Sequence, residues 1–363
     1  MWNLLNLKTE AFGLDISGSS LKFIKLKKKG KFFDLASYGE SPIKNGIIKN
    51  GEIRDSKSLI KIIKDSLAEA KGEKLRTKYV VASLPEEKAF LQVIQLPKIP
   101  EEDLRSAVIY EAENYIPLPI EDVYLDFQIV KPVFNHLDHL DILIAALPRK
   151  IVDRYTFCLK EAGLKPKVLE IESLAISRSL IKNGLSNSPV LLIDFGMTKT
   201  SFIIFSGYSL IFTSSIPISS QQITEAISKA LKVDSARAEK LKKEYGLELD
   251  SKNKEIVDII KPILVNLVEQ IKKHIDYYQY HSFHEHLSPG GRGLEKILFF
   301  GGGANLKGLS DFLASELHLS IEIANPFINV FEESKKSKPP ISFEQSLSYA
   351  TAFGLALRGI KEL

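Results

Sequence analysis

The sequence is short of cysteine and of long apolar runs, and both shortages limit the kind of protein it can encode. Its 363 residues contain one cysteine, Cys158, so no disulfide can form within the chain and a reducing compartment is expected. No apolar stretch reaches the roughly 18 residues of a membrane-spanning helix, and the first residues lack the apolar core and cleavage site of a signal peptide. We therefore expect a cytoplasmic protein.

Strong net charge and two common nucleotide motifs are also missing. The 49 basic and 45 acidic residues leave a net charge of +4, which gives no reason to expect nucleic-acid binding. No Gly-x4-Gly-Lys-Ser/Thr motif occurs, and the triple glycine at 301–303 has Leu306 where a dinucleotide motif needs its third glycine. A P-loop enzyme is therefore excluded, and a dinucleotide enzyme fits the sequence poorly.

Two similar turns, each beginning with an aspartate, lie 179 residues apart in the chain. Each stands between two short apolar runs, a pattern that predicts a strand, a tight turn and a second strand. Glycines let a ligand approach the backbone, N–H groups and hydroxyls bind phosphate oxygens, and two carboxylates can hold Mg²⁺ through water. The alternatives are that both aspartates only form turns and that the lysine of the first turn is an ordinary surface residue. The candidate phosphate-binding residues are Asp15, Ser17, Gly18, Ser19, Ser20 and Lys22 in the first turn, and Asp194, Gly196, Thr198, Lys199 and Thr200 in the second.

A third element is the apolar run 297–300, which leads directly into Gly301, Gly302, Gly303 and then Asn305. The pattern predicts a buried strand, a glycine turn and a helix. Without Cβ atoms, the turn would let a base and ribose lie flat against the backbone, and the N-terminus of the helix would add a partial positive charge. Together, the three elements predict a nucleotide held between two halves of the chain.

The order of these elements resembles the superfamily of actin, Hsp70 and the sugar kinases. The resemblance implies an α/β, actin-like (Hsp70/FtsA-type) duplicated ribonuclease-H-like fold, whose two lobes close over ATP and Mg²⁺, with Asp15 and Asp194 as the metal-binding pair. The segment 238–246 further resembles the cell-division and pilus branch, in which a helix supplies Glu and Lys to the adenosine. Glu239 and Lys242, three residues apart on one helical face, are the matching positions.

Hydrolysis of ATP is expected to be slow at most. The segment Glu172-Ser173-Leu174-Ala175 resembles the Glu-Pro-x-Ala crossover of hydrolytic relatives, so Glu172 is the candidate catalytic residue. Ser173 replaces the proline, and Ser17-Gly18 reverses the order of glycine and serine that is usual in the family. Since positioning of the attacking water is most of the catalysis, the crossover with Ser173 favours slow turnover, whereas the Ser17-Gly18 order bears on the approach of the β-phosphate and hence on nucleotide affinity.

The segment 95–123 narrows the resemblance to the PilM family of type IV pilus assembly proteins. This resemblance implies an ATP-binding component of the type IV pilus platform, or of a related type II secretion platform, at the inner face of the cytoplasmic membrane. It reaches the membrane through the N-terminal tail of a PilN-like protein; the pilus motor ATPases and further copies of the chain are additional candidate partners. The tail is expected to lie as an extended peptide in a groove formed by the first lobe and the insert. The groove residues expected are Ile99, Tyr115, Ile116, Leu118 and Ile120.

The resemblance also divides the chain into four subdomains. The first lobe (1A) is expected to take residues 11–86, 167–187 and 341–363, and the inserted 1C-type subdomain residues 87–166. The second lobe (2A) is expected to take residues 188–222 and 294–330, and a helical subdomain (2B) residues 223–293. An insert at this position is typical of the cell-division and pilus branch, whereas MreB and true actin carry a different one elsewhere.

Two other functions stay open at this stage. One is a small-molecule kinase of the same superfamily, which would need a catalytic aspartate and a substrate pocket. The other is a filament-forming cell-division protein such as FtsA. FtsA is anchored by an amphipathic C-terminal tail, which residues 360–363 do not resemble, so the PilM family is expected.

Overall fold

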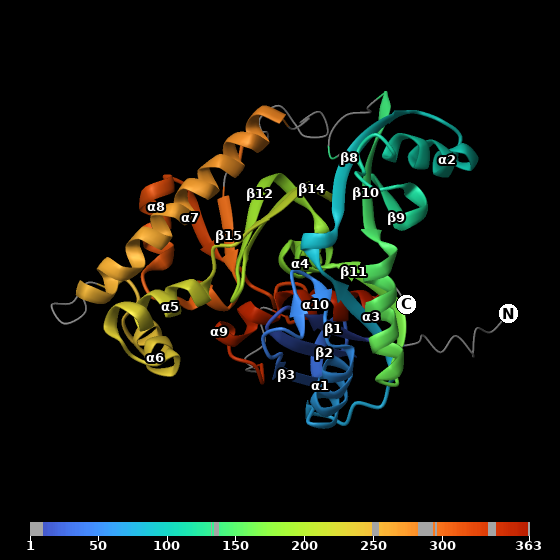
Figure 1. Cartoon of the computed structure of the whole chain (residues 1–363). Helices are drawn as coiled ribbons and strands as arrows, with labels where there is room; N and C mark the ends of the chain where they lie inside the picture. Colours follow the sequence, from blue (N-terminus) through green and yellow to red (C-terminus); the bar gives the residue numbers. More distant parts are fainter. Residues whose placement is uncertain are drawn as a thin grey trace.

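The computed structural model describes residues 10–131, 133, 138–248, 254–281, 293–294, 296–332 and 339–361. Two lobes, each built on its own mixed sheet, are joined side by side, and a smaller third sheet projects beside them (Figure 1). None of the helices within these ranges is long and apolar enough to cross a membrane.

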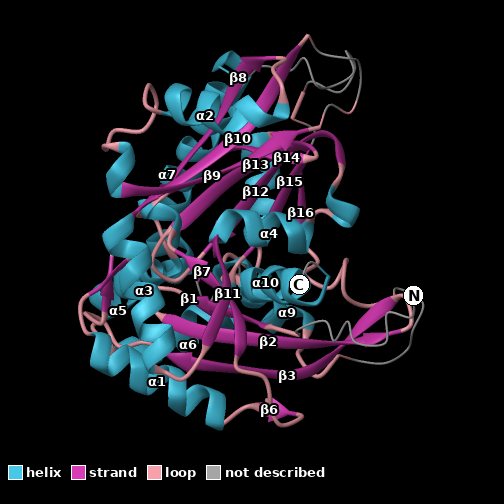
Figure 2. Cartoon of the chain, turned by 90° about the vertical axis from the view of Figure 1, so that its right-hand side faces the viewer, coloured by secondary structure: helices cyan, strands magenta, loops and turns pink. Residues whose placement is uncertain are grey.

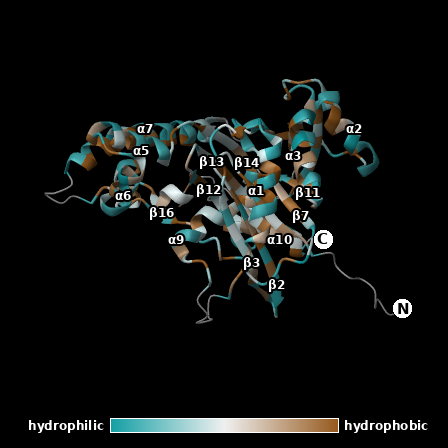
Figure 3. Ribbon diagram, turned by 60° about the horizontal axis from the view of Figure 1, so that its bottom comes forward, coloured by the Kyte–Doolittle hydropathy of each residue, from teal (hydrophilic) through white to brown (hydrophobic). Residues whose placement is uncertain are grey.

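The first lobe is a six-stranded sheet centred on β1. This strand is completely buried, runs antiparallel to β2 and parallel to β7, and so sits in the middle of the lobe. The outer end of β2 leaves the core, and its tip is hydrophilic (Figure 3). In spatial order the strands are β11 (Lys165–Ile171), β7 (Tyr79–Leu84), β1 (Phe12–Ile16), β2 (Ser20–Lys29), β3 (Phe32–Pro42) and β6 (Lys71–Gly72), and a separate hairpin is formed by β4 (Ile48–Lys49) and β5 (Glu52–Ile53).

The second lobe repeats the topology of the first. Its hairpin and third antiparallel strand lie on one side, and two parallel strands lie on the other, as in the first lobe. Asp15 is paired with Lys22 near the first turn, and Asp194 is paired with Ser201 near the second. The predicted duplication is therefore confirmed. In spatial order the strands are β14 (Ser209–Ile216), β13 (Thr200–Gly207), β12 (Ser186–Phe195), β15 (Lys296–Phe300) and β16 (Ser320–Ile323).

Helices from distant parts of the chain complete the first lobe. The last helix packs against β1 and α4, and glycines make this close approach possible. A methyl group on Gly354 would lie 1.8 Å from the carbonyl oxygen of Ala175, and one on Gly13 would lie 2.4 Å from the backbone nitrogen of Ala356. The elements are α1 (Ser56–Ala68), α3 (Arg149–Glu161), α4 (Glu172–Leu180), η3 (Lys182–Gly184), α9 (Phe343–Ser346), η6 (Leu347–Tyr349) and α10 (Ala350–Lys361).

The second lobe is covered by helices that enclose its own apolar core. The long helix α7 runs diagonally beside the sheet (Figure 1) and tolerates Pro262 in its first turns. Buried residues of α5 and α7 pack with those of β12, β13 and β15 in one cluster. The helices are α5 (Ser220–Leu231), α6 (Ser235–Tyr245), α7 (Lys254–His281) and α8 (Leu309–Leu317).

The segment after the triple glycine differs from the prediction. A helix was expected to follow the glycines directly, but residues Gly302–Asn305 form a single 3-10 turn, η5, and α8 begins at Leu309. Gly301 has a φ of 88°, which turns the chain away from a helical path immediately after β15. The N-terminus of α8 is therefore not at the glycines.

The insert contains a three-stranded sheet with a core of its own. Its strand β8 lies beside β14, so the insert also touches the second lobe (Figure 2). Helix α2 ends at Ala112, so Tyr115 lies beyond it and is half exposed, whereas Ile116 is buried. The elements are η1 (Glu86–Lys88), β8 (Phe90–Pro97), α2 (Glu101–Ala112), η2 (Ile120–Asp122), β9 (Val123–Val130) and β10 (His139–Pro148).

Candidate functional site

The two aspartate turns face each other across the junction of the lobes. A methyl group on Gly18, in the first turn, would lie 4.0 Å from Oγ1 of Thr198 in the second. Asp15 also lies close enough to Asp194 for its negative charge to raise the pKa of Asp194. The structure therefore brings the two predicted turns together, although 179 residues separate them in the sequence.

The first turn is held by its own serines. The Ser17 hydroxyl donates to the Ser20 carbonyl at 3.0 Å and accepts from the Ser20 N–H at 3.1 Å. Nζ of the buried Lys22 donates to Oγ of Ser20 at 2.5 Å and lies 3.3 Å from the Glu40 carboxylate. Lys22 is thus fixed inside the fold and is not an ordinary surface lysine. Ser19 and Gly18 complete the turn and are partly exposed.

The second turn exposes one hydroxyl and uses the other within the fold. The Gly196 N–H donates to the Lys199 carbonyl at 3.0 Å, which closes the turn. Thr198 is exposed at its tip, where a ligand can reach it. Thr200 is completely buried, and its hydroxyl donates to the Ile218 carbonyl at 2.6 Å. Thr200 was predicted to bind phosphate; its hydroxyl instead stabilises the second lobe, because strand register turns it inward.

Lys199 bridges the two lobes through carboxylates. Its Nζ lies 3.0 Å from Oε2 of Glu172, at the start of α4, and also pairs with Glu87 of η1. Burial would lower the pKa of Lys199, but Glu172 and Glu87 hold it well above its usual value. Glu87 was not found from the sequence, because it stands 112 residues from its partner and belongs to no motif.

Several buried carboxyl groups face the cleft, and burial raises the pKa of each. Burial raises the pKa of Asp15, opposed by Lys22 and by a 3.1 Å hydrogen bond from Ser83. Burial likewise raises the pKa of Asp194 to about 6, opposed by Lys199. The candidate catalytic Glu172 has a pKa of about 8, raised by burial against the lowering effect of Lys199.

These carboxylates fit a magnesium ion that arrives with a nucleotide. Four acidic side chains, including Glu87, lie near two lysines, so a cation would relieve repulsion in the cleft. Within the described residues, no group of three or more His, Cys, Asp or Glu side chains is arranged to hold a metal by itself. Mg²⁺ ordinarily takes one or two carboxylates together with phosphates and water, and Asp15 and Asp194 can supply that pair.

The triple glycine packs against the second turn and leaves one backbone face open. A methyl group on Gly301 would lie 2.2 Å from Oδ1 of Asp194, and one on Gly303 would lie 2.5 Å from the Phe195 ring. A methyl group on Gly302 would meet no atom within 4 Å. Two of the glycines are therefore required by packing, and the third offers exposed backbone for a flat ligand.

Asn305 and Lys242 contact neighbouring segments of the protein. The Asn305 amide donates to the Glu344 carbonyl at 3.0 Å. Lys242 is buried, and its Nζ donates to the hydroxyls of Ser220 at 2.9 Å and Thr224 at 2.8 Å. Lys242 was predicted to bind adenosine; its ammonium group instead ties α6 to the start of α5.

Glu239 is more accessible than Lys242. Its carboxylate accepts from Nζ of Lys242 at 2.6 Å, and its side chain is 36% exposed. It also lines a shallow hollow along α6, together with Lys240, Lys243 and neighbouring residues. Of the predicted adenosine pair, Glu239 can therefore reach a ligand directly.

The predicted partner groove around residues 99–120 does not form a continuous surface. Ile116 is only 5% exposed and belongs to the core of the insert, against which Ile99 and Ile120 also pack. Tyr115 and Leu118 are 49% and 36% exposed. Only these two of the five predicted residues present substantial side-chain surface, because the others supply the core that holds α2 on the sheet.

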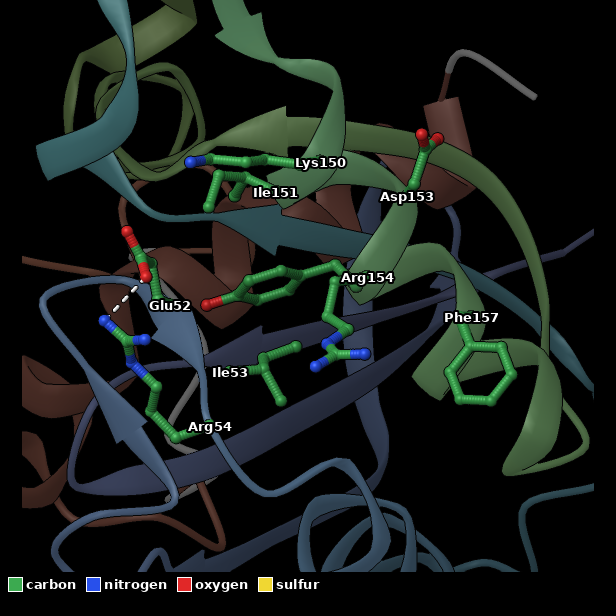
Figure 4. A pocket seen from close by; sticks show the side chains of 9 residues that line it. Glu52, Ile53, Arg54, Lys150, Ile151, Asp153, Arg154 and Phe157 are labelled. Atoms are coloured by element: carbon green, nitrogen blue, oxygen red, sulfur yellow. Dashed lines mark ion pairs between the residues drawn. The ribbon is translucent and has the colours of Figure 1, made fainter.

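A different hollow, of about 620 Å³, lies between the β4–β5 hairpin of the first lobe and α3 (Figure 4). Its charged rim includes the Glu52–Arg54 pair, 2.7 Å apart, and Phe157 is 49% exposed. No sequence motif pointed to this pocket, because it joins segments about 100 residues apart. Its lining residues are Glu52, Ile53, Arg54, Lys150, Ile151, Asp153, Arg154, Tyr155 and Phe157.

Comparison with known proteins gives similarities to proteins of the actin-like fold. A structure of a PilM–PilN type IV pilus biogenesis complex is 30% identical, covers 98% of this chain and 99% of that chain, and has a TM-score of 0.79. A structure of MreB5 of Spiroplasma citri bound to ADP is 13% identical, covers 96% of this chain and 95% of that chain, and has a TM-score of 0.53, which supports the fold alone.

Cell-division proteins are more distant relatives. FtsA of Streptococcus pneumoniae is 24% identical over 345 residues, which is 84% of this chain and 73% of that protein. FtsA of Pseudomonas aeruginosa is 22% identical over 226 residues, 56% of this chain, and the match spans half the length of that protein.

The model of one family covers nearly the whole chain. The family described as type IV pilus assembly protein PilM matches residues 13–360, which include both aspartate turns, the insert and the triple glycine. The predicted actin-like fold is confirmed by this match and by the structural similarities. The chain therefore belongs to the PilM family of type IV pilus assembly proteins.

Proposed function

We propose that the protein is the actin-like, ATP-binding PilM component of a type IV pilus platform, and that it binds the N-terminal tail of a PilN-like membrane protein. The observation that carries this proposal is the similarity to a PilM–PilN complex over 98% of the chain. The FtsA relatives are less similar and do not favour a cell-division role. Through its partner, the protein would act at the inner face of the cytoplasmic membrane.

Nucleotide binding is supported by the geometry of the cleft. Ser17, Gly18 and Ser19 of the first turn would cradle phosphate oxygens from one side, and Gly196 and Thr198 of the second turn from the other. Asp15 and Asp194 would hold Mg²⁺, which supplies positive charge to the phosphates. Gly302 and Glu239 would meet the adenosine. Lys22 would contribute its charge from inside the first turn.

Slow turnover at most follows from the position of Glu172. Its raised pKa of about 8 keeps much of this group protonated at neutral pH, and its carboxyl is engaged by Lys199. A group in this state is a poor acceptor of a proton from water. The chain's own residues are therefore better arranged to hold a nucleotide than to hydrolyse it.

The pocket between the β4–β5 hairpin and α3 is the proposed seat of the partner peptide. It lies within the first lobe, beside the insert, since α3 follows directly on β10, and it combines an apolar floor with a charged rim. Ile53, Ile151 and Phe157 would receive apolar side chains, while Arg54 and Arg154 would meet polar groups of the peptide. The exposed surface around Tyr115 and Leu118 of the insert is the alternative binding site for the peptide.

Calorimetric titration of the full chain tests both parts of the proposal. Mg-ATP and a synthetic peptide with the N-terminal sequence of the PilN-like protein from the same source should each bind. Phe157→Ser should weaken peptide binding by about tenfold or more, the usual effect of removing an aromatic anchor. Tyr110→Ser removes another exposed aromatic group outside the pocket and should change nothing.

The same titration distinguishes the two candidate peptide sites, the pocket at α3 and the insert surface. Weaker peptide binding in Leu118→Glu with unchanged binding in Phe157→Ser would place the peptide at the insert surface instead. Failure of the wild-type protein to bind the peptide would contradict the partner proposal. Failure to bind Mg-ATP would contradict the nucleotide site while leaving the partner proposal standing.

A further inference from the structure

One turn of the chain lies between the nucleotide cleft and the peptide pocket and contacts both. The turn is η1, Glu86–Lys88, and each of its three charged side chains contacts a different part of the protein. Glu86 accepts from the backbone N–H of Ser173 in α4 at 3.1 Å. Glu87 pairs with Lys199 of the second lobe. Nζ of Lys88 donates to Glu52, in the wall of the pocket, at 3.0 Å.

The backbone around η1 is packed directly on the hairpin that forms the pocket. A methyl group on Gly51 would lie 2.8 Å from Cβ of Pro85 and 3.1 Å from Cγ of Lys88. The Gly51 carbonyl accepts a hydrogen bond at 3.2 Å from the hydroxyl of Tyr155, which lines the same pocket. A displacement of η1 is therefore transmitted to the hairpin and to the pocket wall, because no space separates them.

The Glu86 side chain adds a reason for η1 to have a second position. Its residue is only 6% exposed, and within the described part of the chain its Oε1 is buried without a hydrogen-bond partner. A buried carboxylate oxygen without a partner is costly, so the arrangement seen here does not satisfy this group fully. A shift of η1 that gave Oε1 a partner would recover part of that free energy.

Lys199 can donate to different acceptors when the cleft is empty and when it holds a nucleotide phosphate. Without a ligand its ammonium is held by Glu87 and Glu172. The turn that carries it is also the proposed phosphate-binding turn, and phosphate oxygens are strong acceptors for lysine. Lys199 carries a single positive charge, so phosphate oxygens compete with the two carboxylates for the position of its ammonium group.

We propose that η1 couples the nucleotide cleft to the peptide pocket, so that Mg-ATP and the partner peptide change each other's affinity. The inference rests on the proposed function. When Lys199 turns to phosphate, Glu87 loses its partner, η1 is released from the second lobe, and the Lys88–Glu52 contact at the pocket wall changes with it. The coupling is reciprocal, since each ligand alters the same equilibrium between two positions of η1.

The test is the ratio of peptide dissociation constants measured with and without saturating Mg-ATP. In the wild-type chain this ratio should differ from 1 by at least about fivefold, the low end of measured couplings. Glu87→Gln keeps the size of the side chain but removes its charge, and Lys88→Met removes the contact with Glu52. Both variants should still bind each ligand and should bring the ratio close to 1.

Two further variants control the experiment. Glu73→Gln removes an exposed ion pair with Lys27 on the other side of the first lobe and should keep the wild-type ratio. Lys88→Arg retains the charge and should restore most of the coupling that Lys88→Met loses. Thermal unfolding of each variant checks that it is folded before its ratio is compared.

The outcomes separate this inference from the proposed function. If the wild type binds both ligands with a ratio of 1, the cleft and the pocket are independent and the inference fails, while the proposed function stands. If the ratio differs from 1 and survives in both Glu87→Gln and Lys88→Met, coupling does not pass through η1. If the wild type binds neither ligand, the proposed function fails, and the inference fails with it.

Discussion

Replacing Asp194 by asparagine tests the electrostatics of the cleft, because it removes one negative charge and keeps the size of the side chain. Burial raises the pKa of Asp194 from its usual 3.8 to about 6, with Lys199 opposing and Asp15 adding to the rise. The ionised carboxylate therefore weighs against folding at neutral pH. A tenfold change in proton affinity is about 1.4 kcal/mol, so this difference corresponds to a penalty on the order of 3 kcal/mol.

The pH dependence gives the sign of the effect. For an acid whose pKa is raised by folding, the penalty is fully present above the folded pKa of about 6 and disappears below the unfolded value of 3.8. In urea unfolding at pH 7.5, Asp194→Asn should be more stable than the wild type by about 2–3 kcal/mol, and the gap should fall to roughly half at pH 5. The same variant should lose Mg-ATP affinity by an order of magnitude or more, since a metal contact is removed.

A matched variant, Asp34→Asn, is expected to change the free energy of unfolding in the opposite direction. A hydrogen bond from Lys29 lowers the pKa of Asp34, against the effect of burial, so Asp34→Asn should reduce stability at pH 7.5 by less than about 1 kcal/mol. It should leave Mg-ATP binding unchanged. The reasoning is refuted if Asp194→Asn is less stable than the wild type at pH 7.5, or if it binds Mg-ATP as tightly.

Four other substitutions test features of the fold and site. Thr200→Val should lower the free energy of unfolding by about 1–2 kcal/mol, because the buried Thr200 hydroxyl donates to a carbonyl 2.6 Å away, and it should leave Mg-ATP binding unchanged. Thr198→Val should weaken Mg-ATP binding and leave the free energy of unfolding unchanged. Urea unfolding and calorimetry distinguish them, and the reverse pattern would contradict both assignments. Burial holds the pKa of His274 below its usual 6.5, so the unfolded chain takes up a proton that the folded chain refuses, and stability should fall as the pH drops from 7 to 5. His274→Gln should show a smaller loss, and identical pH profiles would rule this out. Gly354→Ala should destabilise the protein by about 3 kcal/mol, because the new methyl would lie 1.8 Å from the Ala175 carbonyl oxygen; an unchanged denaturation midpoint would show that α10 can move aside.

Much of the fold follows from local patterns in the sequence. The two aspartate turns predicted the duplicated hairpins, because an acidic turn between apolar runs has few other solutions. The turn after the triple glycine was predicted less well, since the glycines permit several backbone paths and the choice among them depends on packing against Asp194 and Phe195.

The candidate site was harder to predict because side-chain direction depends on distant partners. Thr200 and Lys242 have the right chemistry for a nucleotide, yet both are used inside the fold by residues from other elements. Glu87 has no motif of its own and gains its place in the cleft only through Lys199. The pocket at α3 combines two segments about 100 residues apart, and periodicity within one segment carries no information about such a junction.

The packing of α10 on β1 has a consequence for the order of events during synthesis. The first described strand and the last described helix pack on each other, and Ala11, beside β1, shares a buried cluster with Leu355 of α10. The second lobe, by contrast, draws its strands and helices from a single continuous region between β12 and β16. On the ribosome, the second lobe can therefore close while the first still waits for its final helix. The first lobe becomes complete only after α10 has been synthesised, which makes the nascent chain dependent on protection of an unfinished amino-terminal sheet until then.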